Sequence, residues 1–232
     1  MEKLDVIVCA AHPDDAELGC GGTIAKLTKR NKKVGIIDFT LGELGTRGTP
    51  ELRKQEAQRS TAILNVAVRE NIALKDGFFY PDEDSLLRLI QVIRKYKPEI
   101  LLLNAPADRH PDHGNAGNFA LRAAFLSGLA KIKTEFSAWR PKHTFHYIQD
   151  RFLQPTFVVN ISAEFEQKMK AIQAFKSQFY DPNSTEPMTY ISNPEFLHFV
   201  EARAREMGHF IGSTYGEGFI QTGPFEMELP PA

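Results

Sequence analysis

The sequence predicts an α/β fold, a Rossmann-like and mostly parallel sheet that is flanked by helices on both faces. Through the first half, short apolar runs alternate with helical patterns, and each intervening stretch is long enough for a crossover helix. The runs are apolar throughout, which is typical of strands that are buried on both faces. With 232 residues, 42% of them hydrophobic, the chain can bury one large core, and we expect a single domain over residues 1–232.

The elements of the first half follow from local composition. Each expected strand is a short run rich in aliphatic residues, and each expected helix shows apolar residues at helical spacing. The strands are expected at residues 4–10, 33–40, 66–74 and 99–104. The helices are expected at residues 21–31, 51–64, 83–96 and 116–130.

The second half is expected to complete the wall of a ligand pocket. Its strand-like runs are residues 143–149, 156–161 and 213–221, and its helical patterns are residues 164–179 and 194–208. Tyr190, His198 and Glu217 are candidate contributors to this wall. Packing or an oligomer contact is the alternative for each of them.

Topology brings two unusual motifs together. In the strand order 3-2-1-4, the first and fourth strands are neighbours, and ligands bind beyond their carboxyl ends. The motif AHPDDAE leaves the first strand, and DRHPDHGN leaves the fourth. We therefore expect two clusters of histidines and carboxylates to face each other across one cleft.

Composition and charge exclude several classes of partner. With 28 basic and 29 acidic residues the net charge is -1, so no global field attracts nucleic acid or an anionic membrane. Acidic residues replace the glycine fingerprint of a dinucleotide site, which disfavours a nucleotide-binding oxidoreductase. The start lacks a signal peptide pattern and no run is long enough to span a membrane, so we expect a cytoplasmic protein with a small-molecule substrate.

The two cysteines are not candidates for the nucleophile. Cys9 falls in the first expected strand, and Cys20 falls after the acidic turn. In a reducing compartment they are most simply a core residue and a loop residue rather than a disulfide.

Three residues form a candidate metal site. His12 and Asp15 come from the first motif and His113 from the second. Two imidazoles and one carboxylate leave coordination positions open for water and substrate, as catalytic zinc requires, and such a set also suits ferrous iron. Asp14 is then free to act as the general base that takes a proton from the attacking water, because neighbouring side chains point apart in an extended backbone.

The second motif offers two further catalytic candidates. His110 is the candidate second proton carrier, or stabilises the oxyanion as an imidazolium. Asp112 is expected to orient His110 and to favour its charged form.

Structural alternatives exist for these motifs. A lone histidine and aspartate pair is usually a hydrogen-bonded surface contact, but two such motifs at the ends of neighbouring strands make coincidence a poor explanation. Glu17 is either a carboxylate in the first turn of a helix or a support for a ligand histidine.

At these residues the sequence resembles the LmbE-like, or PIG-L-like, family of metal-dependent N-acetylglucosamine deacetylases, through AHPDDAELGCGG and HPDH. With GTRGTPELRKQEAQRS, FKSQFYD and IGSTYGEGF it is most similar to the bacillithiol-biosynthesis deacetylases. The resemblance implies zinc held by His12, Asp15 and His113, a base at Asp14 and an assisting histidine at His110. It also implies hydrolysis of N-acetylglucosaminyl malate to glucosaminyl malate and acetate, in the cytosol and often by a hexamer.

Arginines are the candidates for binding the sugar or the malate, since a guanidinium grips a carboxylate with two hydrogen bonds. Arg53 and Arg109 are the main candidates, and Arg47, in a glycine-rich loop, is a third. Alternatively, Arg53 pairs with Glu56 on a solvated helix face, and Arg109 neutralises neighbouring acids.

Two other functions remain open. The same metal and fold suit a deacetylase or amidase that acts on bacillithiol S-conjugates or on another N-acetylated glycoside. A sugar-binding module without catalysis is the non-enzymatic alternative, and a spare base at Asp14 argues against it.

Overall fold

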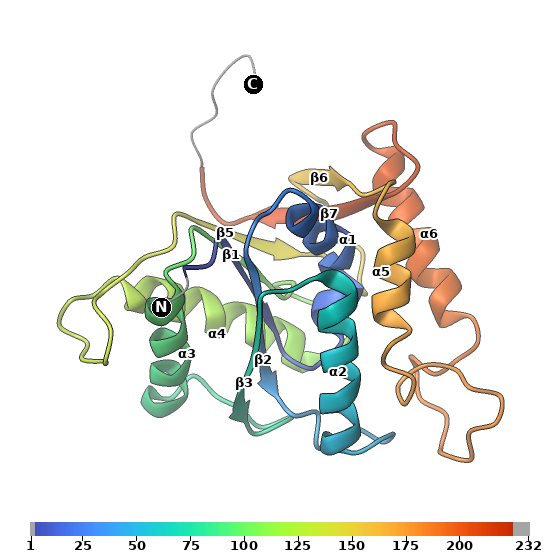
Figure 1. Ribbon diagram of the computed structural model, residues 1–232, viewed down its shortest axis with the longest axis horizontal. Helices are drawn as coiled ribbons and strands as arrows, with labels where there is room; N and C mark the ends of the chain where they lie inside the picture. Colours follow the sequence, from blue (N-terminus) through green and yellow to red (C-terminus); the bar gives the residue numbers. More distant parts are fainter. Residues whose placement is uncertain (1–2, 225–232) are drawn as a thin grey trace.

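The computed structural model describes residues 3–224, which form one seven-stranded sheet with helices packed against it (Figure 1). The strands are β1 (Val6–Ala10), β2 (Val34–Thr40), β3 (Val68–Leu74), β4 (Ile100–Leu103), β5 (His143–Tyr147), β6 (Phe157–Asn160) and β7 (Gly216–Gln221). The helices are α1 (Asp15–Lys29), α2 (Pro50–Leu64), α3 (Glu83–Tyr96), α4 (Pro111–Ser127), α5 (Phe165–Ile172) and α6 (Phe196–His209).

The strand order confirms the predicted fold class. It is β3-β2-β1-β4-β5-β7-β6, and β1 lies between β2 and β4 with parallel pairing on both sides. β7 is antiparallel to both β5 and β6, so one edge of the sheet is antiparallel. The carboxyl ends of β1 and β4 therefore meet at the same edge of the sheet, as the topology argument requires.

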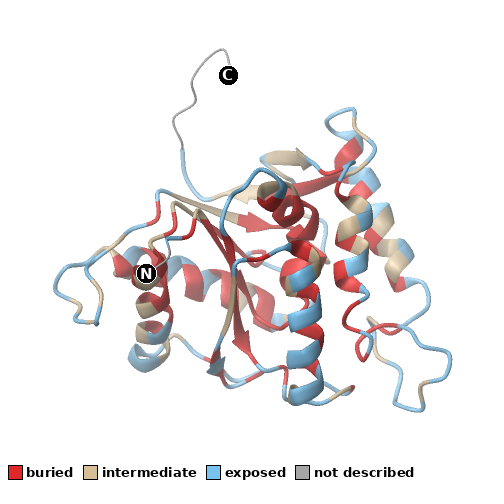
Figure 2. Ribbon diagram, in the orientation of Figure 1, coloured by how far each residue is buried: buried red, intermediate tan, exposed pale blue. Residues whose placement is uncertain are grey.

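Helices cover both faces of the sheet. α3 packs on α4 on one face, whereas α1, α2 and α5 pack together on the other (Figure 1). Alternate residues of β1 supply the two cores: Ile7 and Cys9 pack toward α3 and α4, and Val8 packs toward α1. Both faces of β1 and β2 are buried (Figure 2), which explains why these strands are apolar throughout. Among residues 3–224, no helix combines the length and the apolar character that crossing a bilayer requires.

Two helices begin earlier than the sequence predicts. α1 begins at Asp15 rather than at residue 21, and α4 begins at Pro111 rather than at residue 116. α1 has non-helical torsion angles at Cys20, where two helical segments join across a kink, and the glycines around that kink hid its first turns from the sequence pattern. The predicted loops after β1 and β4 are thus largely the first turns of helices.

The cysteines are buried and free, as predicted, but Cys20 lies inside α1 and not in a loop. Burial raises the pKa of the Cys9 thiol to about 12 and also raises that of Cys20. A thiol that is neutral near pH 7 is a poor nucleophile, so the chemistry of this protein resides elsewhere.

Candidate active site

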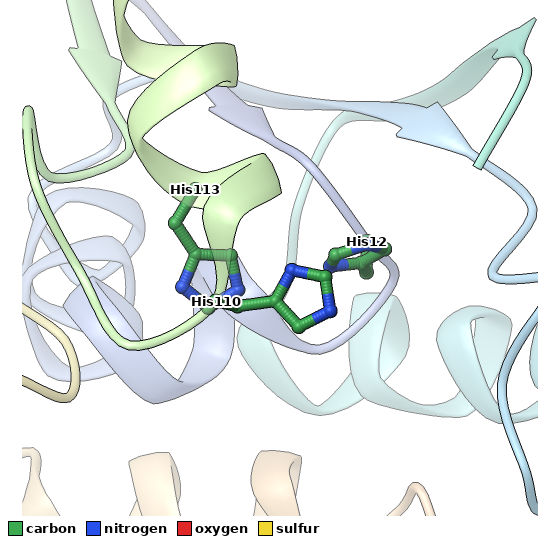
Figure 3. A group of neighbouring side chains, drawn as sticks. All are labelled: His12, His110 and His113. Carbon is green, nitrogen blue, oxygen red and sulfur yellow. The ribbon is translucent and has the colours of Figure 1, made fainter. Parts of the chain in front are cut away.

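Two helix starts face each other beyond the carboxyl ends of β1 and β4. Asp14 is the N-terminal cap residue of α1, and His110 is that of α4. Side chains from both motifs line one cavity of about 420 Å³. His12 comes from the turn after β1, while His110 and His113 come from the start of α4, and the three rings gather at this point (Figure 3).

The predicted ligand residues lie side by side. Asp15 Oδ2 is 3.4 Å from Nδ1 of His12, and Asp15 Oδ1 is 3.1 Å from Nε2 of His113. One ring nitrogen from each of His12, His110 and His113 lies within 4.8 Å of the other two. The carboxylate of Asp15 therefore sits between two imidazoles that are separated by about a hundred residues in sequence.

Other carboxylates hold the far sides of these imidazoles. Asp108 Oδ2 is 2.7 Å from Nδ1 of His113. Nε2 of His12 lies 3.0 Å from Asp76 and 3.3 Å from Asp112. With those nitrogens engaged, Nδ1 of His12 and Nε2 of His113 are the ring atoms that face Asp15.

This donor set fits a divalent metal ion. It offers two imidazole nitrogens and one carboxylate, which suits zinc or ferrous iron. Each imidazole is also backed by a carboxylate, an arrangement that fixes the tautomer of metal-ligating histidines. Within residues 3–224, two further combinations place three ligand atoms within 4.8 Å of one another and share His12: one is completed by His110 and His113, the other by Asp76 and Asp112.

Ionisation within the cluster follows from burial and pairing. Burial alone would raise the pKa of Asp15, but His113 and His12 hold it well below its usual range. Burial alone would lower the pKa of His113, but Asp15 and Asp108 raise it to about 9. A cation bound by His113 would replace that proton, because a metal ligates neutral imidazole.

Asp14 stands apart from this set. Its φ is 120°, a strained value for a residue with a side chain, and its carboxylate makes no hydrogen bond to the backbone of α1. The backbone here is not extended, so strand alternation does not apply, and the Asp14 carboxylate pairs with Arg53. Burial raises the pKa of Asp14 to about 7, even though Arg53 opposes the shift. Its pKa therefore suits a general base that works near neutral pH.

His110 differs from the expectation in its charge. Its Nδ1 accepts a hydrogen bond from the backbone N–H of Asp112 at 3.3 Å, which leaves the proton of the neutral ring on Nε2. Burial and the nearby positive charges of His12 and His113 lower the pKa of His110. The neutral form is therefore favoured, and the expected imidazolium is not.

Asp112 orients His110 through its backbone and not through its carboxylate. The carboxylate instead accepts from the backbone N–H of Gly77 at 2.9 Å and contacts His12. The prediction that the Asp112 carboxylate contacts His110 is therefore wrong. The first turn of α4 carries this side chain toward the loop after β3.

Comparison with known proteins agrees with the site. Residues 7–124 match the family described as PIG-L: GlcNAc-PI de-N-acetylase. The chain belongs to the PIG-L family. The curated relatives that match most of this chain are named deacetylases, and this PIG-L protein is an N-deacetylase, a hydrolase of the amide bond.

Two similar sequences and one similar structure are compared with this PIG-L protein. Diacetylchitobiose deacetylase of Thermococcus kodakarensis is 31% identical, over 75% of this chain and 70% of its own. A probable N-acetyl-alpha-D-glucosaminyl L-malate deacetylase 2 of Bacillus anthracis is 27% identical, over 82% of this chain and 93% of its own. The solved structure of the conserved protein TT1542 from Thermus thermophilus has a TM-score of 0.89 at 34% identity, and the match covers 99% of both chains.

Three arginines line the cavity of the PIG-L protein, each with a different environment. Arg53 is buried beside Asp14 and donates to the Pro13 carbonyl, so it does not lie on a solvated helix face. Arg109 pairs with Asp150 at 2.8 Å and lies 4.0 Å above the ring of Tyr190, rather than neutralising its neighbours in sequence.

The other predicted contributors divide between cavity and core. Tyr190 lines the cavity, whereas His198 is exposed and contacts Glu195. Glu217 is buried away from the histidines, where it pairs with Lys168 and accepts from backbone N–H groups of α1.

Glu17 contacts no ligand histidine. It is fully buried and accepts hydrogen bonds from Ser60 and Arg69, both at 2.6 Å. This contact ties the first turn of α1 to α2 and β3, so Glu17 stabilises the turn that carries Asp14 and Asp15.

Sequence reasoning missed four residues of the site: Asp76, Asn104, Asp108 and Gln149. Gln149 and Asn104 donate to the two oxygens of Asp15, at 2.7 and 3.3 Å. Asp108 lies in the same motif as His113 and was accessible to a motif argument. Asp76 and Gln149 follow other strands with no local pattern, and only the folded sheet brings them to the site.

Proposed function

We propose that this PIG-L protein is a metal-dependent deacetylase of N-acetylglucosaminyl malate, with zinc as the metal and iron as the alternative. The observation that carries the proposal is the position of Asp15 between Nδ1 of His12 and Nε2 of His113. Beside this set, Asp14 supplies a base with a pKa of about 7.

Asp14 and His110 have separate roles in the proposed reaction. A bound divalent cation supplies Lewis acidity, which polarises the amide carbonyl and acidifies water. Asp14 accepts a proton on its carboxylate as water attacks the carbonyl carbon. His110 donates a hydrogen bond from Nε2 to the oxyanion, and its neutral state makes it a donor without a buried charge. The proton held by Asp14 then passes to the leaving amine, so that acetate and a free amino sugar result.

The malate substrate is supported by the similarity over 93% of the Bacillus anthracis relative, whose name specifies glucosaminyl malate. A cavity of about 420 Å³ is large enough for a sugar with a small aglycone. Three guanidinium groups line it, and malate carries two carboxylates that such groups bind well.

A second candidate substrate is diacetylchitobiose, which the name of the Thermococcus kodakarensis relative specifies. This disaccharide is uncharged, so it makes no use of the arginines as carboxylate ligands. Deacetylation of bacillithiol S-conjugates is a third candidate and shares the malate unit.

Release of free amine from each substrate separates these candidates. The metal-loaded protein is assayed on N-acetylglucosaminyl malate, diacetylchitobiose and a bacillithiol S-conjugate at equal concentration. The proposal predicts the highest kcat/KM on N-acetylglucosaminyl malate. A higher value on either of the others reassigns the substrate, and no amine release from any of them refutes the proposal.

We also propose a cytoplasmic protein that assembles as a hexamer, in keeping with the resemblance of its motifs to bacillithiol-biosynthesis deacetylases. Sedimentation velocity gives the assembly directly from the mass in solution. A monomeric mass of 26.1 kDa would contradict the hexamer.

A further inference from the structure

Of the three guanidiniums that line the cavity, that of Arg47 has the most distant carboxylate partner. Its side chain is only 5% exposed, yet its Nε is buried without a hydrogen-bond partner. The nearest carboxylate oxygen is that of Glu186, 3.7 Å from Nε and beyond hydrogen-bond distance. A buried cation with an unused donor is costly, so an anion that binds at Arg47 is stabilised there.

The other two guanidiniums already have their counter-charges. Arg53 Nη2 is 3.2 Å from Asp14 Oδ2, and although Arg53 Nε is also without a partner, the charge itself is matched. Arg109 Nε is 2.8 Å from Asp150. A second carboxylate at either of these arginines competes with an acid that is already in place, whereas Arg47 has no such close acid.

The chain around Arg47 holds the guanidinium in place. Nη2 donates to Ser184 Oγ at 2.9 Å, and the Arg47 carbonyl accepts from Gln178 at 2.8 Å. The next residue, Gly48, donates its N–H to Glu186 at 2.9 Å. These bonds join the loop after β2 to the segment before α6, so the side chain is preorganised and little conformational entropy is lost when a ligand binds.

We propose that Arg47 is the specificity-determining residue of this enzyme and binds a carboxylate of the aglycone of its N-acetylglucosaminide substrate. The inference rests on the proposed function and locates the malate end, which that function left unassigned. A carboxylate that pairs with the Arg47 guanidinium from the cavity supplies a closer counter-charge than Glu186 does and takes over that weak pairing. Neutral glycosides gain nothing from this contact.

The test compares charged and neutral substrates in one set of variants. Arg47→Met is assayed on N-acetylglucosaminyl malate and on diacetylchitobiose, with Arg59→Met, which removes an exposed arginine of α2, as the charge-matched control. We expect Arg47→Met to lower kcat/KM on the malate substrate by about 30-fold, mostly through KM, and to change it by less than about 3-fold on the neutral one. Activity on the neutral substrate shows that the variant is folded.

Two further variants keep the test decisive if Arg47→Met does not fold. Arg47→Lys retains the positive charge but lacks the planar guanidinium that binds a carboxylate through two hydrogen bonds, so it is expected to lose part of the malate preference. Glu186→Gln removes the competing carboxylate and is expected to lower KM for the malate substrate alone.

The outcomes distinguish this inference from the proposed function. Equal losses on both substrates, or no loss on the malate substrate, overturn the role of Arg47 and leave deacetylation intact. The same selective loss in Arg109→Met instead of Arg47→Met also overturns it, because the carboxylate then binds at Arg109. If the wild-type enzyme deacetylates neither substrate, the proposed function fails, and this inference fails with it.

Discussion

Arg53 and Asp14 form a buried ion pair, with Nη2 of the arginine 3.2 Å from Oδ2 of the aspartate. The same Nη2 donates to the Pro13 carbonyl at 2.5 Å, so one guanidinium holds both the catalytic carboxylate and the strained backbone that presents it. The pair opposes the effect of burial on Asp14 and keeps the pKa of that carboxyl near 7.

Replacement of Arg53 is expected to shift the pH profile. In Arg53→Met the pKa of Asp14 rises, so the ionised base is present only at higher pH. The acid limb of kcat/KM should move upward by about one pH unit or more. Lys54→Met, which removes the neighbouring exposed charge of α2, is the control and should leave the limb in place. An unchanged limb in Arg53→Met would argue against the ion pair as the cause.

Gly42 allows Arg53 to reach Asp14. Its φ is 67°, and a Cβ at this position would lie 1.9 Å from Arg53 Nη1. Gly212 has a similar φ of 65°, but nothing lies within 4 Å of its added Cβ. Alanine at either position should lower the free energy of unfolding by about 1–2 kcal/mol because of the positive φ.

Only Gly42→Ala should also lower kcat, since it alone displaces Arg53. Denaturant melts and kinetics on the two variants give both quantities. Equal kcat in Gly42→Ala and Gly212→Ala would show that Arg53 tolerates displacement.

Asp108 is expected to act on metal affinity. Its carboxylate lies 2.7 Å from Nδ1 of His113 and also accepts from the backbone N–H groups of residues 109 and 151. Asp108→Asn should weaken metal binding by about 10–100-fold, and excess metal should restore activity. Competition with a chelator of known affinity measures the change, with Asp84→Asn, which alters an exposed carboxylate of α3, as the control. Wild-type metal affinity in Asp108→Asn would show that Asp108 does not support metal binding.

Metal uptake should release protons. The pKa of His113 in the metal-free protein is about 9, so its ring is protonated at pH 7, and a metal ion binds the neutral ring. Addition of zinc to metal-free protein in weak buffer at pH 7 should therefore acidify the solution. The share of this release that comes from His113 should decline as the starting pH is raised through about 9, whereas His12, whose pKa is also raised, contributes a further proton. No release at pH 7 would mean that His113 is not a ligand.

Sequence and structure agree where a local pattern is tied to topology. The motifs after β1 and β4 converge because buried parallel strands specify neighbouring carboxyl ends, and this relationship is visible in the apolar runs. The pairing of β7 between β5 and β6 was not visible, because antiparallel edge strands from distant segments carry no such rule.

The finer chemistry depended on side-chain direction. Asp112 was assigned to His110 because the two are close in sequence, but the helical first turn of α4 carries its carboxylate toward His12 and Gly77. Asp76 and Gln149 were missed because each sits alone after its strand. The Nε–H of Arg47 lacks a hydrogen-bond partner because of how the side chain is packed, and no sequence pattern predicts this.

The central claim is that Asp15 holds a metal ion together with His12 and His113, whereas its neighbour Asp14 performs the proton transfer. Metal content and turnover measured together on Asp14→Asn and Asp15→Asn test it most directly. The account predicts that Asp14→Asn keeps wild-type metal content while kcat falls by about 10²–10⁴-fold, and that Asp15→Asn loses the metal. Loss of metal from Asp14→Asn, or full metal content in Asp15→Asn, would contradict it.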